Sequence, residues 1–193
     1  WLNRRTLMRG AFGLVGVSAL GGLAGCADGG PMVGPSSQPV VDAEVARRVA
    51  GRSVVTANLI PQTTTLDLGA LQVDTWAFGE SVPGPLIRAT AGDLLRITVD
   101  NRLAVGTSVH CHGIALRNDM DGVHDLTQHP TEPGGEFVYR FTAPDPGTYW
   151  FHPHMGLELD RGLYAPLIIE DPNEPPLADV EFTSHGLVYA TVP

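Results

Sequence analysis

The chain has 193 residues, 43% of them hydrophobic, and carries a formal net charge of −9 at pH 7. This length and apolar content suffice for one domain with a core, and an acidic chain without a basic stripe is a poor match for nucleic acid. All 12 basic residues are arginine, and 23 Gly with 16 Pro predict many turns.

Residues 1–25 have the pattern of an export signal. Arg4 and Arg5 precede an uncharged run over residues 10–25, which is too short to span a bilayer as a stable helix. The arginine pair resembles a bacterial twin-arginine (Tat) signal. Residues 23–26 resemble a lipobox, which predicts cleavage before Cys26 and a lipid on its thiol. We expect an exported lipoprotein at the outer face of the cytoplasmic membrane, in the periplasm or in the cell envelope. It would contact the membrane only through this lipid. The alternatives are an uncleaved anchor and a plain signal peptide.

Two further segments flank the expected domain. Residues 26–48 are predicted to be a tether, since residues 27–39 are rich in Gly, Pro and Ser, and residues 42–48 have only a weak helical pattern. Residues 173–193 are predicted to be a linker or the truncated start of a next domain. The chain begins with Trp, and residues 177–193 are too short to form a second domain. We therefore expect it to be a fragment of a longer protein.

Residues 49–172 predict a domain built of strands. Short segments that alternate or run apolar are separated by Pro, Gly and Asp turns, and no convincing helix lies among them. This pattern predicts an all-β fold, a Greek-key β-sandwich or barrel. The expected strands include residues 54–60, 71–78, 93–101, 136–141, 147–151 and 167–170.

Two His-x-His motifs carry most of the chemical information. His110 with His112, and His152 with His154, lie in stretches that read as strands, where residues i and i+2 face the same side. Two such strands as neighbours would bring four imidazoles together. Clustered imidazoles suit Cu, Zn, Fe or Ni and not Mg or Ca. The chain is therefore predicted to form one wall of a transition-metal site.

The residues around the pairs narrow this prediction. Gly113 allows a close approach to the first pair. Pro153 cannot donate a ladder hydrogen bond, which places the second pair at an edge or a strand end, where a site can open towards another domain. The zinc or iron sites of cupin-like enzymes usually add a carboxylate, but no Asp or Glu lies within either pair. All-imidazole ligation favours copper.

Cys111 stands between the histidines of the first pair. A blue-copper centre combines two His, a Cys thiolate and a weak Met, but strand alternation turns Cys111 away from the face of its neighbours. We expect a small buried residue, without a disulfide if Cys26 carries lipid. For Met120 and Met155 we favour ordinary packing over a role as copper ligands. For His124 and His129 we favour solvated positions in a loop, and no role is given to His185.

Residues 73–172 resemble the N-terminal cupredoxin (plastocyanin-like) domain of a bacterial multicopper oxidase of the laccase-like family. Two departures are that Cys111 stands where the family usually has Trp, and His124 where it often has Pro. The matching segments are residues 78–79 with 82–85, 92–93 with 101–103, 110–113, 119–122, 147–154 and 160–169.

The resemblance implies a function. In this family four His-x-His motifs, two from the first and two from the last domain, hold a trinuclear copper cluster that reduces dioxygen to water. By position His110 corresponds to the type 2 copper ligand, and His112, His152 and His154 to ligands of the type 3 pair. The parent enzyme would oxidise phenols, diamines or metal ions such as cuprous ion. The 193 residues alone would be inactive, because the other ligands belong to a C-terminal cupredoxin domain.

Two alternatives stay open at this point. One is a non-enzymatic periplasmic or cell-surface copper-binding lipoprotein that buffers or delivers copper. The other is the first half of a two-domain copper enzyme such as a nitrite reductase. The match to the oxidase family over residues 160–169 favours the oxidase over this alternative.

Overall fold

The computed structural model describes residues 34–50 and 52–174. The chain divides into two compact units, Trp1–Gly34 and Pro35–Pro193, and of the first unit only Gly34 is described. The signal segment, Cys26 and His185 lie outside the described residues, so what the sequence predicts for them stays a prediction. Within the described ranges no helix combines the length and the hydropathy needed to cross a membrane.

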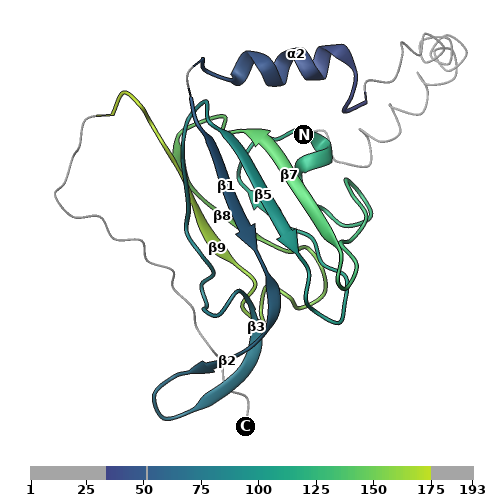
Figure 1. Cartoon of the computed structure of the whole chain (residues 1–193), viewed down its shortest axis with the longest axis vertical. Helices are drawn as coiled ribbons and strands as arrows, with labels where there is room; N and C mark the ends of the chain where they lie inside the picture. Colours follow the sequence, from purple (N-terminus) through teal and green to yellow (C-terminus); the bar gives the residue numbers. More distant parts are fainter. Residues whose placement is uncertain (1–33, 51, 175–193) are drawn as a thin grey trace, which may run out of the picture. The chain divides into compact units, whose positions relative to one another are not determined.

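The described residues form nine strands in three sheets (Figure 1). The first sheet has the order β1 (Val54–Leu59), β5 (Leu94–Asp100) and β7 (Glu136–Thr142); the second has the order β4 (Ile87–Thr90), β9 (Ala165–Glu170), β8 (Gly147–His152) and β6 (His110–His112); the third is a hairpin of β2 (Pro61–Asp67) and β3 (Gln72–Phe78). In the first sheet β1 and β5 pair in parallel, and β5 and β7 pair antiparallel. In the second sheet β4 and β9 are parallel, and the other pairs are antiparallel.

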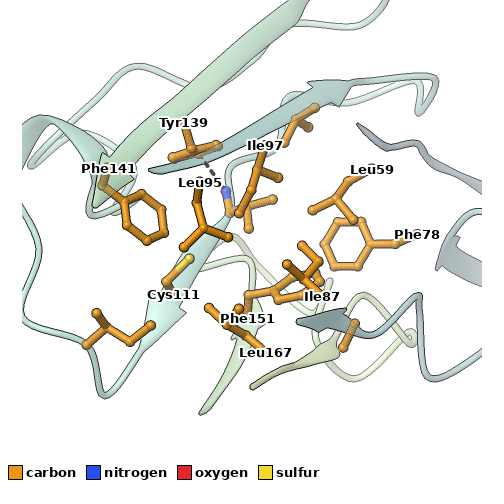
Figure 2. Packing of buried hydrophobic residues seen from close by; sticks show 14 of the residues in the cluster. Leu59, Phe78, Ile87, Leu95, Ile97, Cys111, Tyr139, Phe141, Phe151 and Leu167 are labelled. Atoms are coloured by element: carbon orange, nitrogen blue, oxygen red, sulfur yellow. Dashed lines mark hydrogen bonds between the residues drawn. The ribbon is translucent and has the colours of Figure 1, made fainter. Parts of the chain in front are cut away.

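Alternation along the strands explains how the two larger sheets share one core. In β5 the side chains of Leu95, Ile97 and Val99 are buried, whereas Arg96 between them is exposed. From the facing sheet Phe151 and residues of β4 and β9 reach the same cluster. Figure 2 shows Leu95 and Ile97 of β5 close to Phe151 and Leu167 in this core. The predicted all-β sandwich is confirmed.

Cys111 belongs to this core, as predicted. Its side chain is 1% exposed and its thiol is free. Burial, and next the negative charge of Asp121, raise the pKa of the thiol to about 12. Cys111 is therefore a neutral packing residue that points to the opposite side of β6 from its two histidine neighbours.

Helix α2 (Gln38–Arg47) overlaps residues 42–48, for which the sequence indicates only weak helicity, and begins four residues before them. Hydrogen bonds of Glu44 and Arg47 attach it to the strand domain. Glu44 Oε1 accepts a hydrogen bond from the backbone N–H of Thr142 at 2.5 Å, and Arg47 Nη1 donates to the carbonyl of Ala115 at 3.0 Å. Tertiary contacts stabilise this helix, since none of its own residues is buried.

The β2–β3 hairpin is joined to the segment that follows the second histidine pair. Trp76 in β3 donates its backbone N–H to the carbonyl of Arg161 at 3.2 Å. The Arg161 guanidinium lies over the indole of Trp76, 4.5 Å from the ring centroid. These contacts hold the end of the loop over residues 155–162.

Candidate metal centre

The register of β6 and β8 brings the two histidine pairs together. These strands are antiparallel neighbours, with His110 opposite His152 and His112 opposite Trp150. Strand β8 ends at His152, and His154 lies two residues beyond it, which confirms the strand end predicted from Pro153. The two pairs therefore share one face at the edge of the sheet.

All four imidazoles form one cluster. The His110 ring centroid lies 5.6 Å from His112, 5.7 Å from His152 and 4.6 Å from His154. His152 is 5.4 Å from His112 and 5.1 Å from His154. His112 Nδ1 approaches His152 Nε2 to 3.1 Å. The structure thus assembles side chains that are 40 residues apart along the chain.

Backbone carbonyls orient two of these rings. His110 Nδ1 lies 2.6 Å from the carbonyl oxygen of Asp121, and His152 Nδ1 lies 2.9 Å from that of Pro153. A carbonyl can only accept, so each Nδ1 carries the proton and each Nε2 keeps its lone pair. Such an outer hydrogen bond fixes the tautomer that binds a metal.

A glycine places the carbonyl that His110 needs. Gly122 has φ +75°, and a Cβ at this position would overlap the backbone of Val109. The loop after helix η1 (Asn118–Met120) can therefore pass this close to β6 only with glycine at position 122. Asp121 also places its carboxylate Oδ1 3.4 Å from His110 Nδ1.

Trp150 forms a wall of the cluster. Its indole stacks on His112, with centroids 5.0 Å apart, and on His152, with centroids 4.1 Å apart. Residues 150 and 152 face the same side of β8. Trp150 therefore fixes the planes of two imidazoles and covers them from one side.

Electrostatics favour the neutral form of two of the four rings, His152 and His154. Burial lowers the pKa of His152 below its ordinary value, and the neighbouring histidines lower it further, against the hydrogen bond to Pro153. Burial, followed by His110, also lowers the pKa of His154. Neutral imidazole is the form that binds metal ions.

The donor set fits copper, but not as a closed site for one ion. Neutral imidazoles with free ring nitrogens suit copper. Within residues 34–50 and 52–174, however, no three or more His, Cys, Asp or Glu side chains are arranged to hold one metal ion by themselves. The cluster thus offers the imidazole donors of a copper site.

The structure places the other candidates elsewhere. Cys111 lies in the core, and Met120 Sδ accepts the backbone N–H of Arg140 at 3.1 Å. His124 Nε2 lies 3.0 Å from Asp125 Oδ2, and His129 is exposed. Asp121 and Trp150 also belong to the site, although the sequence did not indicate them. Trp150 could have been found as the residue two before His152 on the same strand face; Asp121 had no such signal.

Comparison with known proteins identifies the family. The family model described as multicopper oxidase matches residues 60–174. The chain belongs to the multicopper oxidase family. Copper is the cofactor of these enzymes, in agreement with the sequence prediction.

Individual multicopper oxidases resemble the chain over different lengths. It is 50% identical to multicopper oxidase MmcO of Mycobacterium tuberculosis over 182 residues, which cover 93% of this chain and 36% of MmcO. It is 47% identical to copper resistance protein A of Pseudomonas syringae over 94 residues, 49% of this chain and 15% of that protein. The chain thus spans about a third or less of these relatives.

Solved structures of multicopper oxidases share the fold. A multicopper oxidase from Pseudomonas thermotolerans gives a TM-score of 0.61 at 36% identity, covering 63% of this chain and 30% of that one. The laccase from Botrytis aclada gives a TM-score of 0.59 at 38% identity, covering 62% and 23%. The cupredoxin-like fold predicted from the sequence is therefore confirmed.

Proposed function

We propose that this chain is the N-terminal domain of an exported multicopper oxidase and that it supplies four ligands to a copper cluster at which dioxygen is reduced to water. The observation that carries the proposal is the β6–β8 register, which gathers four imidazoles at one sheet edge. Because they do not enclose one ion alone, a second domain completes the site. The proposed ligands are His110, His112, His152 and His154.

The individual roles follow the resemblance to the family. We assign His110 to the type 2 copper and the other three histidines to the type 3 pair. Two contacts support this division. His110 alone among the four is bonded to the Asp121 loop, whereas His112 and His152 approach one another to 3.1 Å, as expected for ligands of neighbouring ions.

When bound, copper supplies the one-electron redox chemistry that couples oxidation of a reductant to reduction of dioxygen. The residues of this chain prepare the site. The carbonyls of Asp121 and Pro153 accept hydrogen bonds from Nδ1 of His110 and His152, so that the lone pair of each ring lies on Nε2. Trp150 limits the rotation of two rings and excludes water from their stacked faces.

The whole protein would contain the site that accepts electrons from the reductant in a further domain. Phenols, diamines and cuprous ion are the candidate reductants, and the similarity to a protein named copper resistance protein A supports a role in copper handling. We propose export through residues 1–25 and a lipid on Cys26, with residues 26–48 joining this anchor to a domain of residues 49–172.

The experiment joins sequencing to oxygen uptake. Reading the coding sequence past residue 193 should show two further His-x-His motifs and a late Cys flanked by His. The protein so defined, loaded with copper, should consume dioxygen with a phenol or cuprous ion. A stop codon directly after residue 193, with copper binding and no oxygen uptake, would instead establish the copper-binding lipoprotein. Nitrite turnover without oxygen uptake would also contradict the oxidase.

A further inference from the structure

We infer that Glu158 is a positioning residue, which holds the loop that carries His154 against the segment that leads into His110. The inference rests on the proposed function, since it concerns how the proposed ligands are kept in place. It assigns a role to a buried carboxyl group outside the histidine cluster.

His154 needs support that the other three histidines do not. His110, His112 and His152 lie in paired strands, whereas His154 follows the end of β8 and has no ladder partner. Its ring is nevertheless the closest to His110, at 4.6 Å between centroids. The residues after His154 must therefore determine its position.

The loop over residues 155–162 is compact, and one side chain turns inward. Glu158 donates its backbone N–H to the carbonyl of Met155 at 3.1 Å, and Leu163 donates to the carbonyl of Glu158 at 3.2 Å. The Glu158 side chain is only 4% exposed, whereas Leu157 beside it is 70% exposed. Burying the acid and exposing the leucine reverses the usual preference, so a specific contact must hold Glu158 inward.

That contact is with Thr107. Thr107 Oγ1 donates a hydrogen bond to Glu158 Oε2 at 2.6 Å, and both residues are buried. Thr107 is itself fixed, because its N–H and carbonyl both pair with Thr131, at 3.0 and 2.7 Å. It stands three residues before His110. One hydrogen bond thus connects the segment before the first histidine pair with the loop after the second.

Among the described residues Asp93 is also a buried carboxyl residue, and its hydrogen bonds differ from those of Glu158. Asp93 accepts hydrogen bonds from the backbone N–H groups of Ser53 and Thr90, at 3.0 and 2.8 Å, and so stabilises a turn. Glu158 has one hydroxyl donor, and among the described residues no arginine pairs with it. Burial raises its pKa, while the hydrogen bond from Thr107 and the electrostatic effect of His124 oppose the shift. Glutamine has nearly the same shape as Glu158 and keeps an oxygen that can accept the Thr107 hydrogen bond.

The test compares matched variants of the copper-free, ¹⁵N-labelled 193-residue chain by NMR of the imidazole rings. Thr107→Val removes only the hydroxyl, and Glu158→Ala removes the carboxyl. Both should shift or broaden the His154 ring signals and leave those of His112 in place. Glu158→Gln should restore the wild-type His154 signals, and dispersed amide signals of β5 and β7 report that each variant is folded. Unchanged His154 signals in Thr107→Val and Glu158→Ala would overturn the inference, as would equal changes in all four rings.

A Cu²⁺ titration separates this inference from the proposed function. Glu158→Ala should weaken Cu²⁺ binding about tenfold, as loss of an outer partner of a metal ligand does, and Glu158→Gln should retain it. If the wild-type chain binds no Cu²⁺ but the His154 signals respond as described, the positioning role stands and the copper proposal fails. If the chain binds Cu²⁺ equally well in all variants, the positioning role fails and the copper proposal stands.

Discussion

The two histidine pairs are the same three-residue motif supported in two different ways. His110 and His112 lie inside β6, with Cys111 between them anchored in the core. The second pair spans the end of β8, so that His152 is in the ladder and His154 is outside it. A backbone ladder holds the first pair, while a side-chain contact from a loop supports the end of the second. A short motif can therefore specify which imidazoles lie together without specifying what keeps them in place.

Loss of a histidine from the first pair should have the largest effect. In the copper-loaded full-length oxidase, His112→Ala should lower oxygen uptake by more than the roughly 10–100-fold that loss of an outer partner costs. His129→Ala is the matched control, because His129 is exposed and outside the cluster, and it should retain uptake. Equal activity of His112→Ala and wild type, measured with an oxygen electrode, would remove His112 from the ligand set.

The loop behind the first pair should be the next most sensitive. Gly122→Ala forces a side chain into a left-handed conformation and against the Val109 backbone, which should cost about 3 kcal/mol of unfolding free energy. The Asp121 carbonyl should then move away from His110. Gly134→Ala is the control, because it has a similar φ of +73° but open space around its Cβ. Urea unfolding of both variants measures the difference, and equal losses would attribute the effect to φ alone.

The support of the second pair should depend on pH. Because burial raises the pKa of Glu158 in the folded state, its contribution to stability is complete below the ordinary pKa of glutamate and is lost as the pH rises through the raised value. Glu158→Gln has no such titration. The unfolding free energy of wild type relative to Glu158→Gln should therefore fall across this window. Parallel pH curves for the two proteins would contradict this expectation.

The same contact should be measurable at constant pH. Thr107→Val leaves the buried Glu158 carboxyl without its donor and should cost about 1–3 kcal/mol. Thr107→Ser keeps the hydroxyl and should cost less. Urea unfolding compares them, and a smaller loss in Thr107→Val than in Thr107→Ser would mean that the methyl group, and not the hydrogen bond, matters at this position.

The smallest effect is expected for Cys111, which lies on the side of β6 opposite to His110 and His112. Cys111→Ala removes one buried sulfur and should cost about 1–2 kcal/mol without changing Cu²⁺ binding, because Cys111 points away from the histidines. The native thiol should not react with a disulfide reagent at pH 8, since burial raises its pKa to about 12. Loss of Cu²⁺ binding in Cys111→Ala would place the sulfur at the metal instead.

Most strands of the domain could be predicted because one of their faces is buried. β5 and β7 alternate clearly, and their observed bounds differ from the expected ones by a residue or so. Strand β2 was not predicted, because its threonines alternate between exposed and half-buried positions in a two-stranded hairpin. Helix α2 also had no amphipathic pattern, since it is held by Glu44 and Arg47 and not by a buried stripe.

The residues of the candidate site also fall into those that the sequence reveals and those that it does not. His110, His112, His152 and His154 could be found because alternation places residues i and i+2 on one face, and Cys111 could be turned inward by the same rule. Asp121 acts through its backbone carbonyl, which every residue has. Glu158 acts through Thr107, 51 residues away. No local pattern reports either contact.

The sequence by itself determined the strand class, the imidazole donors and the opposed directions of Cys111 and its neighbours, because these follow from a two-residue period. Only the tertiary structure decided which strands pair, which ring nitrogen carries the proton and what holds His154. Those depend on register and on contacts between distant segments, such as Asp121 with His110 and Glu158 with Thr107. The periodicity of a strand is local, and its partners are not.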